Sequence, residues 1–307
     1  MKTTGTLILF TLGLLSTAGA QADIFGSGAN QFAIEFVTIG DPDNPGDTSG
    51  EPYRAGKVEY AYRIGTYEVS EDMINKANAL AGLDISHDGR GANKPATSIS
   101  WFEAARFVNW LNTSTGNVTA YKFDLNGDFQ LWDPGDDGYD AANRYRNSLA
   151  RYVLPSSDEW FKAAYYDPNE NLYFDFPTGS DSPPVPVASG TSSGTAVYGG
   201  QMEPADVTLA GGLSVYGTMG QGGNVWEWEE TNCYLINDEN AGAPCRGLRG
   251  ANWDVTVAQP MNSLSRSYIA PDFEHGANGF RVASIPEPNT LLLGALATVG
   301  LLVRRRR

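Results

Sequence analysis

The sequence has few of the side chains that bind soft metals and few positive charges. Two cysteines and two histidines in 307 residues cannot complete a four-ligand Cys/His zinc site or hold an iron–sulfur cluster. Lysine and arginine number 21 against 36 aspartates and glutamates, which gives a formal net charge of −15. A chain this acidic offers no electrostatic footprint for a phosphate backbone, so the sequence excludes nucleic-acid binding.

The familiar catalytic loops are also missing. The sequence contains neither a Gly-x-Ser-x-Gly elbow nor a phosphate-binding P-loop, so it offers no evident nucleophile or phosphate cradle. Apolar residues make up 41% and aromatic residues 11% of the chain, a composition that argues against disorder. No internal repeat or obvious linker divides it. We therefore expect one α+β domain over residues 23–284, with little regular secondary structure.

The first 22 residues have the three parts of a secretory signal peptide. Lys2 is followed by an apolar stretch at 7–15, and small residues at 18–20 and 20–22 fit a cleavage site. The alternative is an N-terminal membrane anchor. Export would place Cys233 and Cys245 in an oxidising compartment, where they could form a disulfide. The alternative for these two residues is a pair of buried thiols.

Residues 285–307 form a second terminal signal. Pro-Glu-Pro at 286–288 is followed by thirteen uncharged residues at 291–303 and by Arg304–Arg307. Thirteen residues are short for a membrane span of about 20, and the arginines should remain on the cytoplasmic side. The two end segments carry five bases and one acid, so the body between them has a net charge of −19.

In this order the three parts resemble the PEP-CTERM sorting tail of Gram-negative bacteria. The resemblance implies an exported protein whose partner is an exosortase-type sorting machinery. Such a protein is held in the inner membrane through this segment before processing, and then lies in the cell envelope, at the cell surface or in an extracellular matrix. A permanent membrane anchor is the alternative reading of the tail.

Three helices and two strands are predicted within the body. Ser70 reads as an N-cap, and Ser100 with Glu103 and Ser156 with Glu159 each match the S-x-x-E capping box. Strands are expected at 32–37 and 60–69. The first helix should bury Met73, Ile74, Ala77 and Leu80. Residues 177–223 are rich in glycine, proline and serine, and the prolines at 183–186 predict no regular structure there.

Four segments then follow one another in a known order. They are 95–105, 152–160, Gly-Asn-Val-Trp-Glu-Trp at 223–228, and Arg-Gly-Ala-Asn-Trp at 249–253 before Gly-Phe-Arg-Val at 279–282. Over residues 60–284 this series resembles the formylglycine-generating enzyme, or sulfatase-modifying factor, family. The resemblance implies a single compact α+β domain related to the C-type-lectin-like fold. The tryptophans of these motifs should fill its core, and Arg266 and Arg281 are expected to be ion-pair partners.

Oxidases of this family use copper held by two cysteines, because thiolates are soft ligands that favour Cu(I). Counted without gaps from Trp253, the positions of these cysteines are Val255 and Pro260, and no cysteine follows Cys245. Copper chemistry is therefore not expected. Other branches of the family bind iron through histidines. His87 and His275 with one carboxylate could form such a site, but we expect two solvated side chains instead.

Calcium is the metal that the resemblance favours. The family binds structural calcium partly through the Gly-Asn-Val-Trp-Glu-Trp segment, so the ligands here would be the carbonyls of Gly223 and Val225 and the carboxylate of Glu227. The usual Asp or Asn ligand upstream is absent. A second acidic stretch at 124–128 resembles the start of a calcium loop, but position twelve is Gly135 where such loops have glutamate.

These features favour a non-catalytic binding or structural protein of the envelope or of an exopolysaccharide matrix. Exposed tyrosine and tryptophan side chains within 121–139 are expected to stack on a glycan. The alternative is an enzyme, either a formylglycine-generating oxidase or another metal-dependent oxidase that acts on an exported protein.

Overall fold

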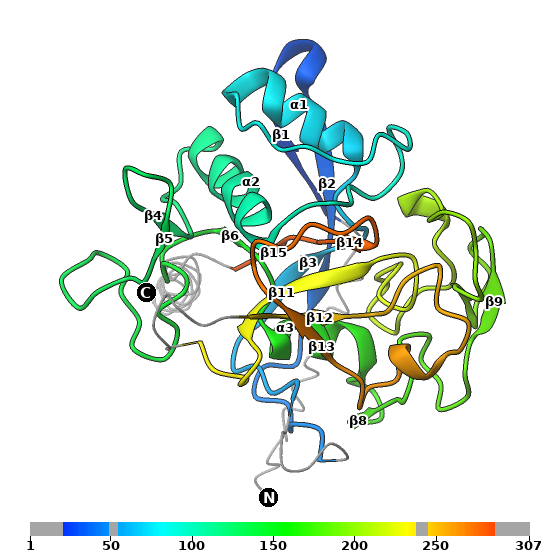
Figure 1. Cartoon of the computed structure of the whole chain (residues 1–307). Coiled ribbons are helices and arrows are strands. Elements are labelled where there is room, and N and C mark those ends of the chain that lie inside the picture. Colours follow the sequence, from blue (N-terminus) through cyan, green and yellow to red (C-terminus); the bar gives the residue numbers. More distant parts are fainter. Residues whose placement is uncertain (1–20, 49–54, 238–244, 286–307) are drawn as a thin grey trace, which may run out of the picture.

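The computed structural model describes residues 21–48, 55–237 and 245–285, which fold around two antiparallel-rich sheets (Figure 1). The larger sheet has the strand order β1-β2-β3-β15-β6, and all its pairings are antiparallel. Its strands are β1 (Gln21–Phe25), β2 (Phe32–Ile39), β3 (Tyr62–Gly65), β15 (Ala283–Ser284) and β6 (Tyr152–Val153). The first and last strands of the domain therefore share one sheet.

The second sheet has the order β13-β12-β11-β14. Its strands are β13 (Ser267–Ile269), β12 (Arg246–Arg249), β11 (Trp226–Asn232) and β14 (Asn278–Gly279), and β11 pairs in parallel with β14. Short pairs and turns complete the fold: β4 (Lys122–Phe123) with β5 (Phe129–Gln130), β7 (Tyr166–Asp167) with β8 (Leu172–Tyr173), β9 (Val185–Val187) with β10 (Thr195–Val197), η1 (Gly28–Asn30), η2 (Val207–Leu209) and η3 (Gln259–Met261).

The helices begin at the predicted caps. They are α1 (Glu71–Ala81), α2 (Trp101–Ser114) and α3 (Ser157–Tyr165). The side chain of Ser70 accepts from the Met73 N–H, and both S-x-x-E pairs form reciprocal capping boxes. Each box satisfies two backbone donors that a helix N-terminus leaves without partners. A short-range side-chain pattern is therefore enough to set where α2 and α3 start.

The core lies between the helices and the sheets and is rich in aromatic side chains. Trp101, Trp160 and Trp228 are fully buried, and the Trp101 and Trp228 indole nitrogens donate to the carbonyls of Glu229 and Ile99. Aromatic rings bring a large apolar area into a domain whose strands are short. The tryptophans of the family motifs thus hold the loops against the core, as predicted.

Three local predictions were wrong. The strand expected at 60–69 covers only Tyr62–Gly65, because the carbonyls of Gly65 and Thr66 accept from Arg281 instead of a neighbouring strand. Leu80 is 40% exposed, since the buried side of α1 ends at Ala77. Pro186 lies in β9, which pairs only with β10 among the described strands, and an edge strand tolerates the missing N–H.

The expected terminal segments fall mainly outside the described residues. Of the predicted signal peptide, only Gln21 and Ala22 are described, and they pair with Phe36 and Glu35 in the larger sheet. Of the predicted sorting segment 285–307, only Ile285 is described. Within the described part of the chain, no helix is long and apolar enough to cross a membrane.

Candidate functional site

Strand β11 carries three buried glutamates, each with a different set of partners. Glu227, Glu229 and Glu230 are all fully buried. The carboxylate of Glu227 accepts from Arg281 at both oxygens, with Nε–Oε2 2.6 Å and Nη2–Oε1 2.5 Å, and from the Trp160 indole at 2.7 Å. Arg281 is fully buried as well, so this ion pair has no contact with solvent. The expected ion-pair role of Arg281 is confirmed.

Glu229 is paired with two arginines. Its Oε1 lies 2.7 Å from Arg249 Nε and its Oε2 lies 2.7 Å from Arg266 Nε. Burial alone would raise the pKa of Glu229, but the charges of Arg266 and Arg249 outweigh it and hold this pKa below its ordinary value. The predicted ion-pair role of Arg266 is therefore confirmed too.

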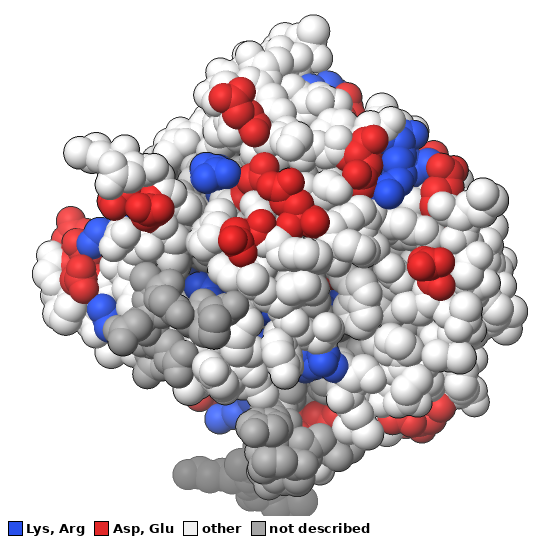
Figure 2. All heavy atoms as spheres, viewed as in Figure 1, with Lys and Arg blue, Asp and Glu red and all other residues white. Residues whose placement is uncertain are grey.

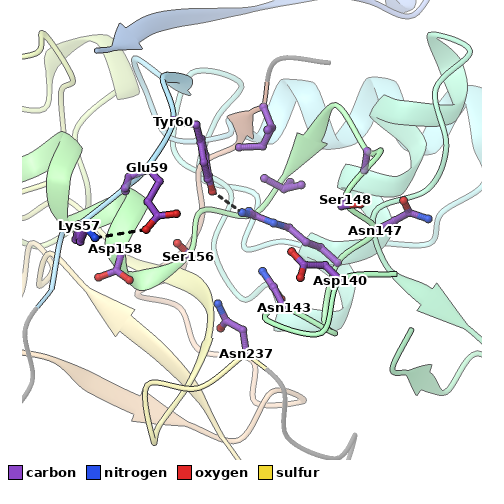
Figure 3. A pocket seen from close by; sticks show the side chains of 15 residues that line it. Lys57, Glu59, Tyr60, Asp140, Asn143, Asn147, Ser148, Ser156, Asp158 and Asn237 are labelled. Atoms are coloured by element: carbon purple, nitrogen blue, oxygen red, sulfur yellow. Dashed lines mark hydrogen bonds and ion pairs between the residues drawn. The ribbon is translucent and has the colours of Figure 1, made fainter. Parts of the chain in front are cut away.

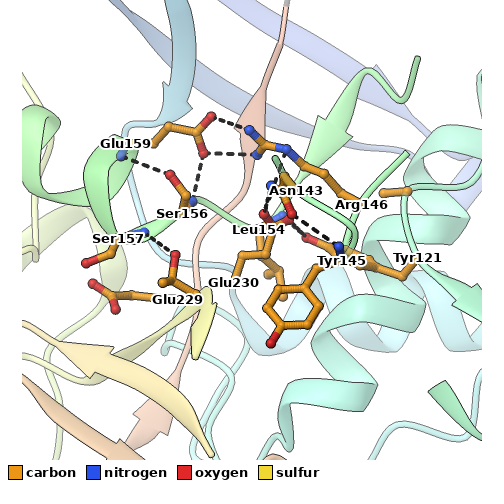
Figure 4. A network of polar contacts seen from close by, with 12 residues as sticks. Tyr121, Asn143, Tyr145, Arg146, Leu154, Ser156, Ser157, Glu159, Glu229 and Glu230 are labelled. Atoms are coloured by element: carbon orange, nitrogen blue, oxygen red, sulfur yellow. Dashed lines mark hydrogen bonds and ion pairs between the residues drawn. The ribbon is translucent and has the colours of Figure 1, made fainter. Parts of the chain in front are cut away.

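Glu230 belongs to a different network, in which two carboxylates share one arginine (Figure 4). Arg146 donates to both oxygens of Glu159, at 3.1 and 2.9 Å, and its Nε lies 3.8 Å from Glu230. Asn143 and Tyr121 donate to Glu230 at 2.6 and 2.9 Å. Burial raises the pKa of Glu230 despite the nearby Arg146, because one guanidinium cannot compensate two buried carboxylates fully.

A pocket of about 350 Å³ opens beside this network (Figure 3). Tyr60 and Arg146 link the two, since the Tyr60 hydroxyl donates to Glu159 at 2.5 Å and accepts from Arg146 at 2.9 Å. The polar lining comes from three parts of the chain: Lys57, Glu59 and Tyr60; Asp140, Asn143, Arg146, Asn147 and Ser148; and Ser156, Asp158 and Asn237. Amide, hydroxyl and carboxylate groups on one wall suit a ligand with many hydroxyl groups.

Asp158 is the most perturbed acid in this pocket. It lies in the first turn of α3, and its Oδ1 accepts the Gly56 N–H at 2.7 Å. Burial raises the pKa of Asp158 to about 6. This carboxyl therefore titrates within the range of ordinary environmental pH.

A larger groove of about 960 Å³ lies at one end of the second sheet. Its walls include Tyr234 and Tyr268, which are 57% and 61% exposed, and its lining also includes Arg249 and Arg266. Cys233 and Cys245 border it and are joined by a disulfide with a Cα–Cα distance of 5.6 Å. Both arginines in the groove are already paired with Glu229.

The expectation that aromatic side chains within 121–139 are exposed is wrong for Tyr121. Tyr121 is 1% exposed and donates its hydroxyl to Glu230, so it belongs to the interior. Trp132 and Tyr139 are half-buried, and Lys122 lies over the Trp132 ring at 5.8 Å. Tyr60, at 38% exposed, is the aromatic side chain of the pocket. The burial of Tyr121 could not be predicted from the acidic composition of 121–139, because its partner Glu230 lies 109 residues away in the sequence.

Comparisons with known proteins place this fold and its motifs in one family. The model of the sulfatase-modifying factor enzyme 1-like domain matches residues 35–285. The chain belongs to the sulfatase-modifying factor family. The PEP-CTERM protein-sorting motif matches residues 284–307, so this family member is an exported protein processed from the membrane.

Solved structures agree on the fold. Treponema denticola variable protein 1 is 20% identical with a TM-score of 0.59, and the match covers 87% of this chain and 99% of that one. CarF is 22% identical with a TM-score of 0.59, over 82% and 98% of the two chains. PvdO from Pseudomonas aeruginosa is 18% identical with a TM-score of 0.53, over 86% and 98%. No curated protein sequence matches the chain.

A count without gaps from Trp253 places Val255 and Pro260 at the copper-ligand positions of the family, and both residues lie in packed parts of the fold. Val255 packs against a buried cluster that includes Phe176 and Met261, and its carbonyl accepts the Gly199 N–H. Pro260 lies within η3. The two cysteines of the chain are engaged in the disulfide beside the groove. Neither position supplies a thiolate for Cu(I).

The residues predicted to bind calcium lie close along the chain, but their carboxylate is engaged. Gly223 donates its N–H to Gly250, and Val225 is fully buried beside it. Both oxygens of Glu227 accept from Arg281. Calcium ligation at Gly223, Val225 and Glu227 stays a prediction, and the ion would compete with Arg281 for the Glu227 carboxylate.

An additional buried acid, which the sequence did not indicate, lies next to this pair. Glu68 accepts from the Asn224 side chain at 2.9 Å, and its Oε2 has no hydrogen-bond partner among the described residues. Burial raises the pKa of Glu68 to about 7, against the opposing charge of Arg281.

The other metal candidates are engaged locally. His87 contacts Asn75 at 3.0 Å and accepts the Gly89 N–H, while His275 accepts the Ala277 N–H at 3.2 Å. The Asp124 carboxylate accepts the N–H groups of its own turn. In the described part of the chain, no three histidine, cysteine, aspartate or glutamate side chains gather in a metal-binding arrangement.

Proposed function

We propose that this exported family member is a non-catalytic binding protein of the cell envelope or of an exopolysaccharide matrix. The polar pocket beside the Arg146 network is where it would hold a sugar chain. The observation that carries this proposal is the pocket lining, which combines the polar groups of Asp158, Asn237 and Ser148 with the aromatic ring of Tyr60. Clefts that combine a few placed polar groups with one aromatic face are typical of small-ligand sites.

A count without gaps from Trp253 places Val255 and Pro260 at the ligand positions of the family's oxidases, so we expect no copper-binding thiolates there. Fold membership does not by itself carry the activity of relatives. The binding proposal therefore rests on the pocket and not on the family name.

Binding is tested with the purified full chain on a glycan array, with an unrelated protein of similar negative charge as the reference. We expect Tyr60→Ala to weaken binding about tenfold, because one aromatic stacking face is lost. Tyr234→Ala is the matched control, since Tyr234 is exposed in the other groove. Array binding no stronger than that of the acidic reference protein would refute the proposal.

The alternative is a formylglycine-generating oxidase or another metal-dependent oxidase acting on an exported protein. It is tested by incubating the full chain with copper and a cysteine-containing sulfatase peptide, followed by aldehyde detection. We expect no conversion above that of a heat-inactivated sample. Efficient conversion, or copper or iron bound in stoichiometric amount after purification, would support the enzyme instead.

A structural calcium ion is a separate proposal for Gly223, Val225 and Glu227. Hard oxygen ligands in an irregular loop are the chemistry that calcium takes. The proposal predicts that a chelator lowers the melting temperature and that added calcium restores it. An unchanged melting temperature would rule out a stabilising ion at this position.

Sorting by an exosortase-type machinery in a Gram-negative bacterium completes the proposal. The mature protein would then leave the inner membrane for the envelope, the surface or the matrix. Mass spectrometry of the protein recovered from each cell fraction should find a chain without Arg304–Arg307 outside the inner membrane. Recovery of only the intact chain in the inner membrane would instead support a permanent anchor.

A further inference from the structure

The pocket beside the Arg146 network contains more negative than positive charge. Glu59, Asp140 and Asp158 line it, against Lys57 and Arg146. Lys57 Nζ lies 3.4 Å from Glu59, and the guanidinium of Arg146 is shared by Glu159 and Glu230. Among the described residues, Asp140 and Asp158 have no basic partner within ion-pair distance.

Asp158 is the group that gains most from a positively charged ligand. It is largely buried, and one of its oxygens accepts the Gly56 N–H at 2.7 Å. Burial raises the pKa of Asp158 to about 6, and among the described residues no basic side chain lies within ion-pair distance of this carboxylate. A ligand N–H⁺ group would supply a charge-assisted hydrogen bond there.

Tyr60 offers the same ligand an aromatic face. Its hydroxyl is held on both sides, by Glu159 at 2.5 Å and by Arg146 at 2.9 Å, so the ring is fixed at the edge of the pocket (Figure 3). An ammonium group near the face of such a ring is attracted by its quadrupole. The apolar face of a sugar ring can pack on it as well.

An unused hydrogen-bond acceptor also lines this pocket. The Oδ1 atom of Asn237 is buried and has no hydrogen-bond partner among the described residues. A buried acceptor without a partner destabilises the folded protein, and a hydrogen-bond donor of a ligand would remove this cost. The pocket therefore presents acceptors and an aromatic face, while its arginine is already occupied.

We propose that this pocket binds an amino sugar whose amine is free and protonated, as in a deacetylated hexosamine polymer. The inference rests on the proposed polysaccharide-binding function and specifies its ligand. Uronic acids are disfavoured because Glu59, Asp140 and Asp158 would repel their carboxylates. N-acetylation removes the positive charge, so it removes the interaction with Asp158.

The test uses three oligosaccharides of equal length: a glucosamine oligomer, its N-acetylated form and a uronic acid oligomer. Calorimetry with the purified full chain at pH 7 should show the glucosamine oligomer binding at least about tenfold more tightly than the other two. Asp158→Asn keeps an acceptor for the Gly56 N–H and removes the charge. We expect this variant to bind the glucosamine oligomer about tenfold more weakly.

Asp254→Asn is the matched control, because it removes one negative charge at an exposed position outside the pocket. Equal losses in the two variants would show non-specific attraction of a cation to an acidic protein and would overturn the inference. Binding of only the N-acetylated or uronic acid oligomer would overturn it while leaving the proposed function standing. Binding of none of the three would count against both.

Discussion

Glu229 and Glu230 are neighbours on β11, yet their side chains meet opposite electrostatic surroundings. The register of β11 with β12 shifts between Trp228 and Asn232, and within this stretch one glutamate meets two arginines while the other shares a single arginine. Glu229 pairs with Arg249 and Arg266 at 2.7 Å each, whereas Glu230 shares Arg146 with Glu159. Burial acts to raise the pKa of both carboxyls. The net shift lowers the pKa of Glu229, because its arginines outweigh burial, and raises the pKa of Glu230.

The comparison shows that the arginines of this acidic domain are distributed unevenly among its buried carboxylates. On the side near β12 and β13, two arginines meet one buried carboxylate. The side of the pocket has an excess of negative charge, extending from the buried Glu159 and Glu230 to Asp158 at its wall. Figure 2 shows further acidic side chains gathered over the upper part of one face of the molecule, with fewer basic ones.

The largest effect is expected when Glu229 loses its charge. Glu229→Gln would leave two mostly buried arginines without their shared carboxylate, and breaking such an arrangement costs about 3–5 kcal/mol of the free energy of unfolding. Urea unfolding of the purified protein measures this value. A loss below about 1 kcal/mol would mean that the surroundings of Glu229 and Glu230 do not differ in the way we describe.

The second effect is a dependence of stability on pH that comes from Glu68. The folded-state pKa of about 7 lies above the ordinary glutamate value of 4.5, so the folded protein binds more protons than the unfolded chain between these values. The free energy of unfolding therefore falls as pH rises from about 4.5 to about 7, by up to roughly 3 kcal/mol for this group.

Glu68→Gln should flatten this slope, because glutamine does not titrate. Urea unfolding at several pH values measures it, and the exposed Glu59→Gln should leave the slope as in the unmodified protein. Glu230 and Asp158 have raised pKa values as well, so a smaller slope of the same sign will remain. A Glu68→Gln protein with the unmodified slope would contradict the assignment.

A third, smaller effect tests the helix that supports the pocket. Ser156→Ala removes the cap of α3 and should cost about 1 kcal/mol. Ser100→Ala, at the matching box of α2, should cost a similar amount because both caps are local. Thermal unfolding of the two variants makes the comparison, and a much larger loss for Ser156→Ala would show that the cap also orients Glu159 toward Arg146.

The smallest effect is expected at Glu230. Glu230→Gln removes one of the two carboxylates that share Arg146 and retains one acceptor oxygen, which can serve either Tyr121 or Asn143. We expect the free energy of unfolding to change by less than about 1 kcal/mol. A loss as large as that of Glu229→Gln would show that Arg146 compensates both carboxylates fully.

Much of the local structure could be predicted from the sequence. The caps at Ser70, Ser100 and Ser156 formed as predicted because each one joins groups only three residues apart. The family motifs also identified the fold and the core tryptophans. Helical periodicity was misleading at Leu80, where the buried stripe stops one turn before the helix ends. The rule against proline in strands was misleading at Pro186, because that residue lies in an edge strand.

The candidate site could not be predicted in the same way. Its pocket brings together residues from 57–60, 140–148, 156–158 and position 237, and no spacing rule connects them. The sequence identified Arg266 and Arg281 as ion-pair partners, but it could not say that Arg281 would meet Glu227, which lies 54 residues away. Tyr121 was assigned to the surface because its neighbours in sequence are polar.

The sequence by itself determined the family, the sorting motif and the helix starts, and it showed that no cysteine follows Cys245. Each of these depends on residue identity or on contacts between near neighbours in the chain. Only the tertiary structure decided which buried glutamate receives two arginines and which shares one. That outcome depends on tertiary packing, because the arginines that meet these glutamates come from segments distant in the chain.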